Sequence, residues 1–175
     1  SRGLGDVYKR QDRIMSWLYP ENEEYADDIA QQENSKIAIG SGQLTGKGLD
    51  NNEVSSANKG NFVSQIQTDF IFAVAGEELG FIGALLVIFL FVALLLRGIY
   101  VAVNARDKFG SMLVVGVIVQ ITLQAALNMA VVTNTIPNTG VSLPFFSSGG
   151  TSLVMLLCEM GVVLSVSRQS AVKRL

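Results

Sequence analysis

The most strongly apolar stretch of the sequence runs without a charge from Leu79 to Leu96, and it restricts the folds available to this chain. As an α-helix it would be about 27 Å long, close to the roughly 30 Å thickness of a bilayer's hydrocarbon core. Two further stretches have the same character, from Ser111 to Val132 and from Gly150 to Val166, the last interrupted only by Glu159. Because 49% of the residues are also hydrophobic, the sequence predicts an all-α, polytopic membrane protein.

Charged residues are distributed unevenly along the chain. Residues 12–69 contain ten acidic and four basic side chains, whereas residues 70–175 contain four acidic and six basic ones. The basic side chains of the second part follow the first and third apolar stretches, and the loop after the second stretch has no charge. Lys and Arg mark the cytoplasmic side of a membrane protein, so this pattern predicts an orientation. We expect extracytoplasmic loops at 12–69 and 133–149, transmembrane helices at 70–96, 111–132 and 150–167, and cytoplasmic segments at 97–110 and 168–175.

The first residues of the chain, SRGLGDVYKRQ, can be encoded by a nucleotide sequence that resembles a transposon adaptor used in sequencing libraries. We therefore interpret residues 1–11 as an artefact and leave them out of the fold. The same interpretation predicts that the natural protein is longer at its N-terminus.

Two residue types with distinctive chemistry are scarce. The chain has no His, and its single Cys, Cys158, lies within an apolar run. A His-based catalytic triad, an imidazole metal site, a thiolate metal cluster and an intrachain disulfide are therefore excluded within this chain.

The polar segment before the first apolar helix has a helix-like part and a glycine-rich part. An amphipathic helix is expected near Asp28 to Ile39, with its charges on a solvated face. The run GSGQLTGKG, from Gly40 to Gly48, lacks the spacing of a phosphate-binding P-loop, so its glycines are expected to allow a tight turn. Lys47, within this run, could then reach an anionic group.

Carboxylates stand at the start of the first apolar helix and inside the third. On a continuous helix, Glu77 and Glu78 would lie roughly 12 to 14 Å beyond Asp69. A carboxylate at membrane depth needs a partner or a path for water. For Glu77, Glu78 and Glu159, structural pairing and a role in a transport pathway remain alternatives. Asp69 could cap the helix or act as a catalyst, and its position alone favours the cap.

Small side chains recur along the first helix at steps of three and four residues. The series is Asp69, Ala73, Gly76, Gly80 and Gly83. On a continuous helix these residues share one face, so we expect a stripe along which another helix packs closely.

Polar side chains recur along the second helix at intervals of four. Gln120, Gln124 and Asn128 form a ladder on one face. We expect this ladder to make hydrogen bonds between helices, in preference to contacts with a substrate.

Four segments resemble the SEDS family of membrane proteins (FtsW, RodA and SpoVE). NTIPNTGVSLPFFSSGGTSL, from Asn134 to Leu153, resembles its signature loop, and QTDFIFAVAGEELGFIG, from Gln67 to Gly83, resembles the end of its large external loop. IAIGSGQLTGKGL and GVVLSVSRQ are also similar to it. The resemblance implies the last three transmembrane helices and the large extracytoplasmic loop of a ten-helix bundle in the bacterial cytoplasmic membrane.

The resemblance also implies an activity, a substrate and a partner. A SEDS protein polymerises lipid II, an undecaprenyl-linked disaccharide-pentapeptide, into glycan strands during cell division or cell-shape maintenance. It works with a class B penicillin-binding transpeptidase and has no nucleic-acid partner. A flippase for lipid II and a structural component of the cell-wall machinery are the alternatives. We expect this fragment alone to be inactive.

The resemblance assigns the catalytic role to Asp69, the aspartate of the TDFIF segment. A carboxylate there could take the proton from an acceptor sugar hydroxyl while the lipid pyrophosphate leaves. The leaving group needs positive charge, either from a divalent cation or from a side chain, for which Lys47 is the candidate.

The signature loop is expected to shape a cavity for the lipid substrate, with a purely structural packing loop as the alternative. Two positions depart from the family, since Ser148 stands where Tyr is usual and Gln67 where His is common. The candidate substrate-binding residues in and after the loop are Pro144, Ser147, Ser148, Gly149, Gly150 and Thr151.

Overall fold

The computed structural model describes residues 13–19, 26–48, 71–146 and 150–172. A short helical segment covers residues 13–18, and the longer helices are α2 (Ala26–Ser41), α3 (Ile71–Val103), α4 (Lys108–Val132) and α5 (Gly150–Val172). Every regular element within these ranges is a helix. By length and composition, three helices could cross a membrane, namely Ile71–Val103, Lys108–Val132 and Gly150–Ser170. The predicted all-α fold with three candidate membrane-spanning helices is therefore confirmed.

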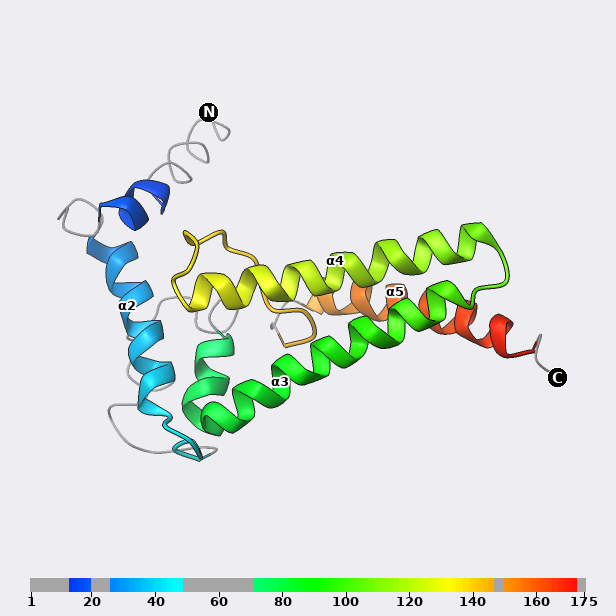
Figure 1. Cartoon of the computed structure of the whole chain (residues 1–175). Helices are drawn as coiled ribbons and strands as arrows, with labels where there is room; N and C mark the ends of the chain where they lie inside the picture. Colours follow the sequence, from blue (N-terminus) through cyan, green and yellow to red (C-terminus); the bar gives the residue numbers. More distant parts are fainter. Residues whose placement is uncertain (1–12, 20–25, 49–70, 147–149, 173–175) are drawn as a thin grey trace.

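Helices α3 and α4 form the centre of the bundle. They lie side by side in opposite directions, joined by the turn at residues 104–107, and α5 packs against both (Figure 1). Near that turn the Ile118 side chain of α4 packs directly on the backbone of α3, because a Cβ added to Gly98 would lie only 2.4 Å from Ile118 Cγ1. The buried apolar side chains here come from all three helices and are Val101, Ala102, Val114, Ile118 and Val163.

A second buried cluster lies towards the other end of the bundle, and it includes α2 and the loop after α4. Ala38 of α2, Phe72 and Ala73 of α3, Val132 of α4 and Leu143 of the loop all belong to it. It therefore holds the start of α3 and the loop after α4 at one end of the bundle.

The helices are longer than the uncharged stretches that predicted them. α3 continues to Val103 and α5 to Val172, both past an arginine. α4 begins at Lys108, where the Asp107 side chain accepts a hydrogen bond from the Gly110 N–H at 3.0 Å. Hydropathy marks only the part of a helix suited to an apolar environment, whereas backbone hydrogen bonds continue through polar residues until a cap ends them.

Helix α3 is broken at Gly80. The backbone angles there are φ 70° and ψ −168°, so residues 71–79 and 81–103 point in different directions (Figure 1). Residues 81–103 alone would be about 35 Å long, enough to cross the roughly 30 Å apolar core of a bilayer. Glu77 and Glu78 thus precede the part of α3 that suffices for the crossing, which explains how an otherwise apolar helix accepts two carboxylates.

The break corrects the prediction of one continuous stripe of small residues. Gly76 and Gly80 do face a close neighbour, because a Cβ added to them would meet Ile39 and Gly46 respectively. At Gly83 the nearest atoms to an added Cβ belong instead to Leu79 of the same helix. The expected stripe is therefore divided at Gly80, because a positive φ turns the chain out of the helical path.

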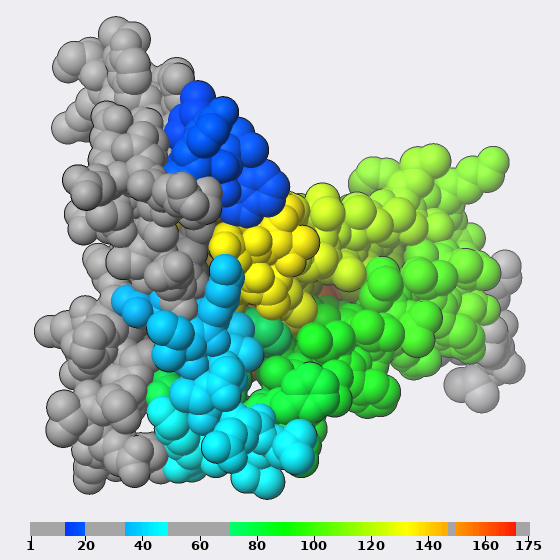
Figure 2. Space-filling model, turned by 60° about the vertical axis from the view of Figure 1, so that its left-hand side comes forward, coloured from blue at the N-terminus to red at the C-terminus, as the bar shows by residue number. Residues whose placement is uncertain are grey.

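Helix α2 crosses the end of the α3 and α4 pair (Figure 1). It contains the region near Asp28 to Ile39 that was predicted to be helical. The buried Ser35 hydroxyl donates to the Val132 carbonyl at 3.2 Å, in the last turn of α4. The Trp17 indole N–H donates to the Asn134 carbonyl at 3.3 Å. Figure 2 shows the end of α4 and the loop after it, in yellow, beside residues 13–19, in dark blue, and residues 34–48, in light blue to cyan.

Candidate functional site

The structure describes part of the predicted site. Asp69, Ser147, Ser148 and Gly149 lie outside the described residues. The predicted site residues within them are Lys47, Glu77, Glu78, Pro144, Gly150, Thr151 and Glu159. The roles of the four residues outside the described ranges stay predictions. The other seven can be placed by their contacts.

The glycine-rich run after α2 forms a tight turn at residues 42–48. The Gly46 N–H donates to the Gly42 carbonyl at 2.8 Å, and Gly46 and Gly48 adopt φ angles of 77° and 92°. Residues with a side chain rarely adopt such angles, so glycine is suited to both positions. The predicted use of these glycines in a tight turn is confirmed.

The turn supplies hydrogen-bond partners at the break in α3. In an unbroken helix, the N–H groups of Phe81 and Ile82 would bond to the carbonyls of Glu77 and Glu78. Here the Phe81 N–H donates to Gln43 O at 2.9 Å, and the Ile82 N–H donates to Leu44 O at 3.3 Å.

The two carbonyls on the other side of the break are satisfied by the same turn. Glu77 O accepts from the Lys47 N–H at 3.0 Å, and Glu78 O accepts from the Gly48 N–H at 3.1 Å. An unpaired backbone group at membrane depth is costly, so these four bonds make the break tolerable.

The turn at residues 42–48 and the bend of α3 at Gly80 together form a junction. The two backbones approach closely there, which requires glycine on both sides. A Cβ added to Gly42 would lie 2.0 Å from Gly76 O, and one added to Gly46 would lie 2.1 Å from Glu78 O. A Cβ on Gly80 would lie 2.3 Å from Gly46 N. All three neighbours are backbone atoms, which cannot rotate away as a side chain can. The turn and the break are thus shaped to each other.

An ion pair accompanies the backbone bonds. Lys47 Nζ lies 3.1 Å from Glu77 Oε1, and the side chains are 21% and 3% exposed. Of the two alternatives for Glu77, the structure thus displays the structural pairing. The same contact places the Lys47 ammonium, predicted to bind an anionic group, against a carboxylate of its own chain. Lys47 is therefore part of the junction with α3.

The signature loop folds back against α4 and is held there by two members of the polar ladder. The Asn128 side chain donates to the Val141 carbonyl at 2.7 Å, and the Gln124 side chain donates to the Ser142 carbonyl at 3.1 Å. Leu143 is 1% exposed, and Pro144 beside it is fully buried. In these two bonds the acceptors are carbonyls of an irregular loop, whereas groups on another helix were expected.

Gln120 does bond to another helix, as was expected of the whole ladder. Its side-chain amide donates to Glu159 Oε1 of α5 at 3.4 Å. The other oxygen, Glu159 Oε2, is buried and has no hydrogen-bond partner among the residues that the structure describes. Glu159 thus has one weak contact, consistent with either alternative predicted for it.

The described candidate residues of the loop differ in exposure. Pro144 is buried in the bundle, whereas Gly150 and Thr151, the first residues of α5, are exposed. Phe145 has a φ of 68°, in a region of backbone angles that residues other than glycine rarely adopt. Such backbone strain persists where surrounding contacts over-determine it and is frequent at functional sites.

Anchoring by Asn128 leads to a testable expectation. Asn128→Leu keeps the size of the side chain but leaves the Val141 carbonyl without its donor, which should cost about 1 to 3 kcal/mol. To measure this, exposed Phe146 is replaced by Cys in a Cys158→Ser background. We expect this cysteine to react faster with a water-soluble maleimide when Asn128→Leu is present than when Asn128 is kept. Gln120→Leu, on the same ladder but bonded to Glu159, should leave that rate unchanged, and equal rates in all three proteins would contradict the anchoring role.

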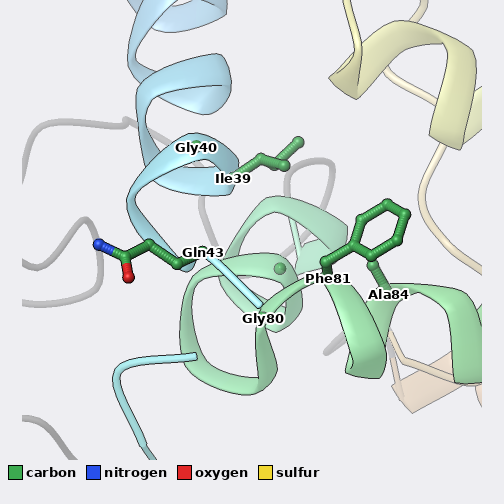
Figure 3. A pocket seen from close by; sticks show the side chains of 7 residues that line it. Ile39, Gly40, Gln43, Gly80, Phe81 and Ala84 are labelled. Carbon is green, nitrogen blue, oxygen red and sulfur yellow. The ribbon is translucent and has the colours of Figure 1, made fainter. Parts of the chain in front are cut away.

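A cavity of about 260 Å³ lies beside the junction, between the end of α2 and the bend of α3. Ile39 and Phe81 form apolar walls, and the Gln43 side chain points away from them (Figure 3). The residues that line it come mainly from two of the segments that resemble the family, IAIGSGQLTGKGL and QTDFIFAVAGEELGFIG.

Possible metal ligands are not clustered within the part of the chain that the structure describes. Within the described ranges, no group of three or more His, Cys, Asp or Glu side chains could hold a metal ion. The divalent cation that was one alternative for the pyrophosphate stays a prediction.

The break in α3 and its repair by the turn were missed by the sequence analysis. A glycine inside an apolar helix is compatible with an unbroken helix, so Gly80 gave no clear signal. There was one usable signal. Gly46 and Gly80 lie in two different segments that resembled the same family, so the two glycines could have been considered together.

The sequence matches the FtsW/RodA/SpoVE family, described as cell cycle protein, over residues 4–172. This range includes residues 4–11, so the interpretation of residues 1–11 as an artefact stays a prediction. Stage V sporulation protein E of Bacillus subtilis is 46% identical over 158 residues, which are 90% of this chain and 42% of that protein.

Other relatives carry names that state an activity. The probable peptidoglycan glycosyltransferase FtsW of Geobacter metallireducens is 40% identical over 93% of this chain and 42% of its own length. The peptidoglycan glycosyltransferase MrdB of Escherichia coli is 38% identical over 91% of this chain and 42% of its own length.

A chain of a solved peptidoglycan synthase complex has a similar fold. That structure is described as showing the structural coordination of polymerization and crosslinking by the complex. It matches with a TM-score of 0.68 at 25% identity, over 93% of this chain and 42% of the matched chain. The chain thus spans about two fifths of the length of the proteins it matches. Because the family match covers nearly all of it, the chain belongs to the FtsW/RodA/SpoVE family.

Proposed function

We propose that this chain is the C-terminal part of a peptidoglycan glycosyltransferase that polymerises lipid II into glycan strands during cell division or cell-shape maintenance. The match over residues 4–172 to a family whose relatives include named peptidoglycan glycosyltransferases carries the proposal. The similarity to a solved peptidoglycan synthase complex supports a transpeptidase partner of the class B penicillin-binding type.

In the proposed reaction, Asp69 acts as the general base. Its carboxylate takes the proton from the 4-hydroxyl of the acceptor sugar as that oxygen attacks the anomeric carbon of the donor, and the lipid pyrophosphate leaves. Asp69 stands two residues before Ile71, the first residue of α3. The junction that fixes the start of α3 supports this role, since a base must be held in reach of its proton.

The signature loop would shape the cavity for the lipid substrate. Its buried anchors at Leu143 and Pro144 hold a backbone that then leads to the exposed start of α5. The core cluster joins this loop to the start of α3, which supports a single site at this end of the bundle. The loop charges support an extracytoplasmic position for that end.

Purified full-length protein with its transpeptidase partner can test this function in detergent. We expect glycan chains from labelled lipid II, because polymerisation in micelles needs no transport across a bilayer. Movement of labelled lipid II across liposome membranes without any polymer in detergent would instead support the flippase alternative. The absence of both activities would leave a structural role in the cell-wall machinery.

A further inference from the structure

The direction of residues 71–79 is set by contacts outside their own helix. Gly80 separates them from residues 81–103, so the continuous hydrogen-bond pattern that makes a helix rigid stops there. Four backbone hydrogen bonds link the two sides of the break to the turn at residues 42–48 instead. The turn thus determines how the first part of α3 is oriented relative to the rest.

The Lys47 and Glu77 ion pair adds a side-chain connection between the same two segments. Glu77 is almost fully buried at 3% exposure, and its Oε1 atom lies 3.1 Å from Lys47 Nζ. Removing Lys47 would take this counter-charge away from the buried Glu77 carboxylate, whereas replacing both members of such a pair by uncharged side chains is often nearly neutral. The turn should therefore shift when either charge is removed alone.

We propose that Lys47 and Glu77 are positioning residues, whose ion pair locks the turn at residues 42–48 onto the bend of α3 and so orients residues 71–79 for glycan polymerisation. This inference rests on the function proposed above. A shift of about 1 Å in a positioned group can lower a rate about 100-fold, so a small rotation at the bend is sufficient to affect the reaction.

The proposal competes with direct binding of the substrate by Lys47. If Lys47 bound the lipid pyrophosphate, its removal would raise KM for lipid II whether or not residue 77 carried a charge. If Lys47 holds the turn, its removal lowers kcat, and neutralising residue 77 as well restores activity. The two roles therefore predict opposite results for the double variant.

The first experiment measures kcat and KM for lipid II with the full-length protein and its partner. Lys47→Met and Glu77→Gln are each expected to lower kcat about 10- to 100-fold, with KM changed less than about twofold. The double variant should recover to within about threefold of the wild-type kcat, because neither member of the ion pair is then left without its counter-charge. Lys47→Arg, which keeps the charge, should also retain most of the activity.

A second experiment measures the junction itself, independently of activity. Nitroxide labels at Ile37 of α2 and Val103 at the end of α3, which are 66% and 79% exposed, report the distance between α2 and the long part of α3. Exposed Cys158 is first replaced by Ser so that it is not labelled. We expect one narrow distance distribution in wild type, a broader one in either single variant, and a narrow one again in the double variant.

Any of three results would overturn the proposal. The first is a rise in KM at unchanged kcat in Lys47→Met, and the second is a double variant whose loss is the product of the two single losses. The third is an unchanged distance distribution in both single variants. If wild type formed no polymer, the proposed function would fail, and the distances alone would still decide whether the ion pair locks the junction.

Discussion

Asp69→Asn in the full-length protein is expected to lower the rate of glycan polymerisation from lipid II by about 100- to 10,000-fold, the usual contribution of a general base. Asn has nearly the same shape as Asp but cannot accept a proton at neutral pH. It also caps a helix about as well as Asp, so a merely structural role would be preserved. The measurement is the initial rate of polymer formation from labelled lipid II, at saturating substrate and with the transpeptidase partner present.

A matched control for this variant is Asp107→Asn. Asp107 caps α4 through its bond to the Gly110 N–H, at the end of α4 opposite the signature loop. Asn can make the same capping bond, so this variant should polymerise lipid II at close to the wild-type rate. An Asp69→Asn protein as active as the control would return Asp69 to a capping role and remove it from the proposed mechanism.

Gly80→Ala is expected to destabilise the protein by about 2 to 6 kcal/mol. The backbone angles of φ 70° and ψ −168° are essentially restricted to glycine, and forcing another residue into them costs about 1 to 3 kcal/mol. The new Cβ would also lie 2.3 Å from Gly46 N and 2.8 Å from Leu44 O. Relieving these backbone overlaps should cost about 1 to 3 kcal/mol more. The measurement is the free energy of unfolding from denaturation in mixed micelles.

The same substitution a short distance away provides the control. Gly40 lies in α2 beside the junction, and a Cβ added to it would have no heavy atom within 4 Å. Alanine is a better helix former than glycine, so Gly40→Ala should be neutral or stabilising by up to about 1 kcal/mol. Equal stability of the two variants would show that the break at Gly80 is not fixed by the turn.

The sequence was sufficient for the helices but not for their ends or their shape. The apolar stretches from Leu79 to Leu96 and from Ser111 to Val132 identified α3 and α4, because a long uncharged run has few other solutions. The bend of α3 was not predicted, since Gly80 alone is compatible with a straight helix. The pairing of Glu77 remained one of two alternatives until Lys47 was found beside it.

The candidate site was predictable to a similar degree. The resemblance singled out the segments around Lys47, Glu77 and the signature loop, and the core cluster brings them to one end of the bundle. It could not indicate that Gln124 and Asn128 hold the loop by its carbonyls. Their spacing places them on one face of α4 but does not identify the acceptor on the other side.

What the sequence by itself determined is what depends on local composition: the three apolar helices, the tight turn of the glycine-rich run, and the family. What only the tertiary structure decided is which groups distant in the chain satisfy one another. The bonds from Gln43, Leu44, Lys47 and Gly48 to the two sides of Gly80 involve backbone N–H and C=O groups. Nearly every residue carries the same two groups, so their partners are set by the folded arrangement and not by residue identity.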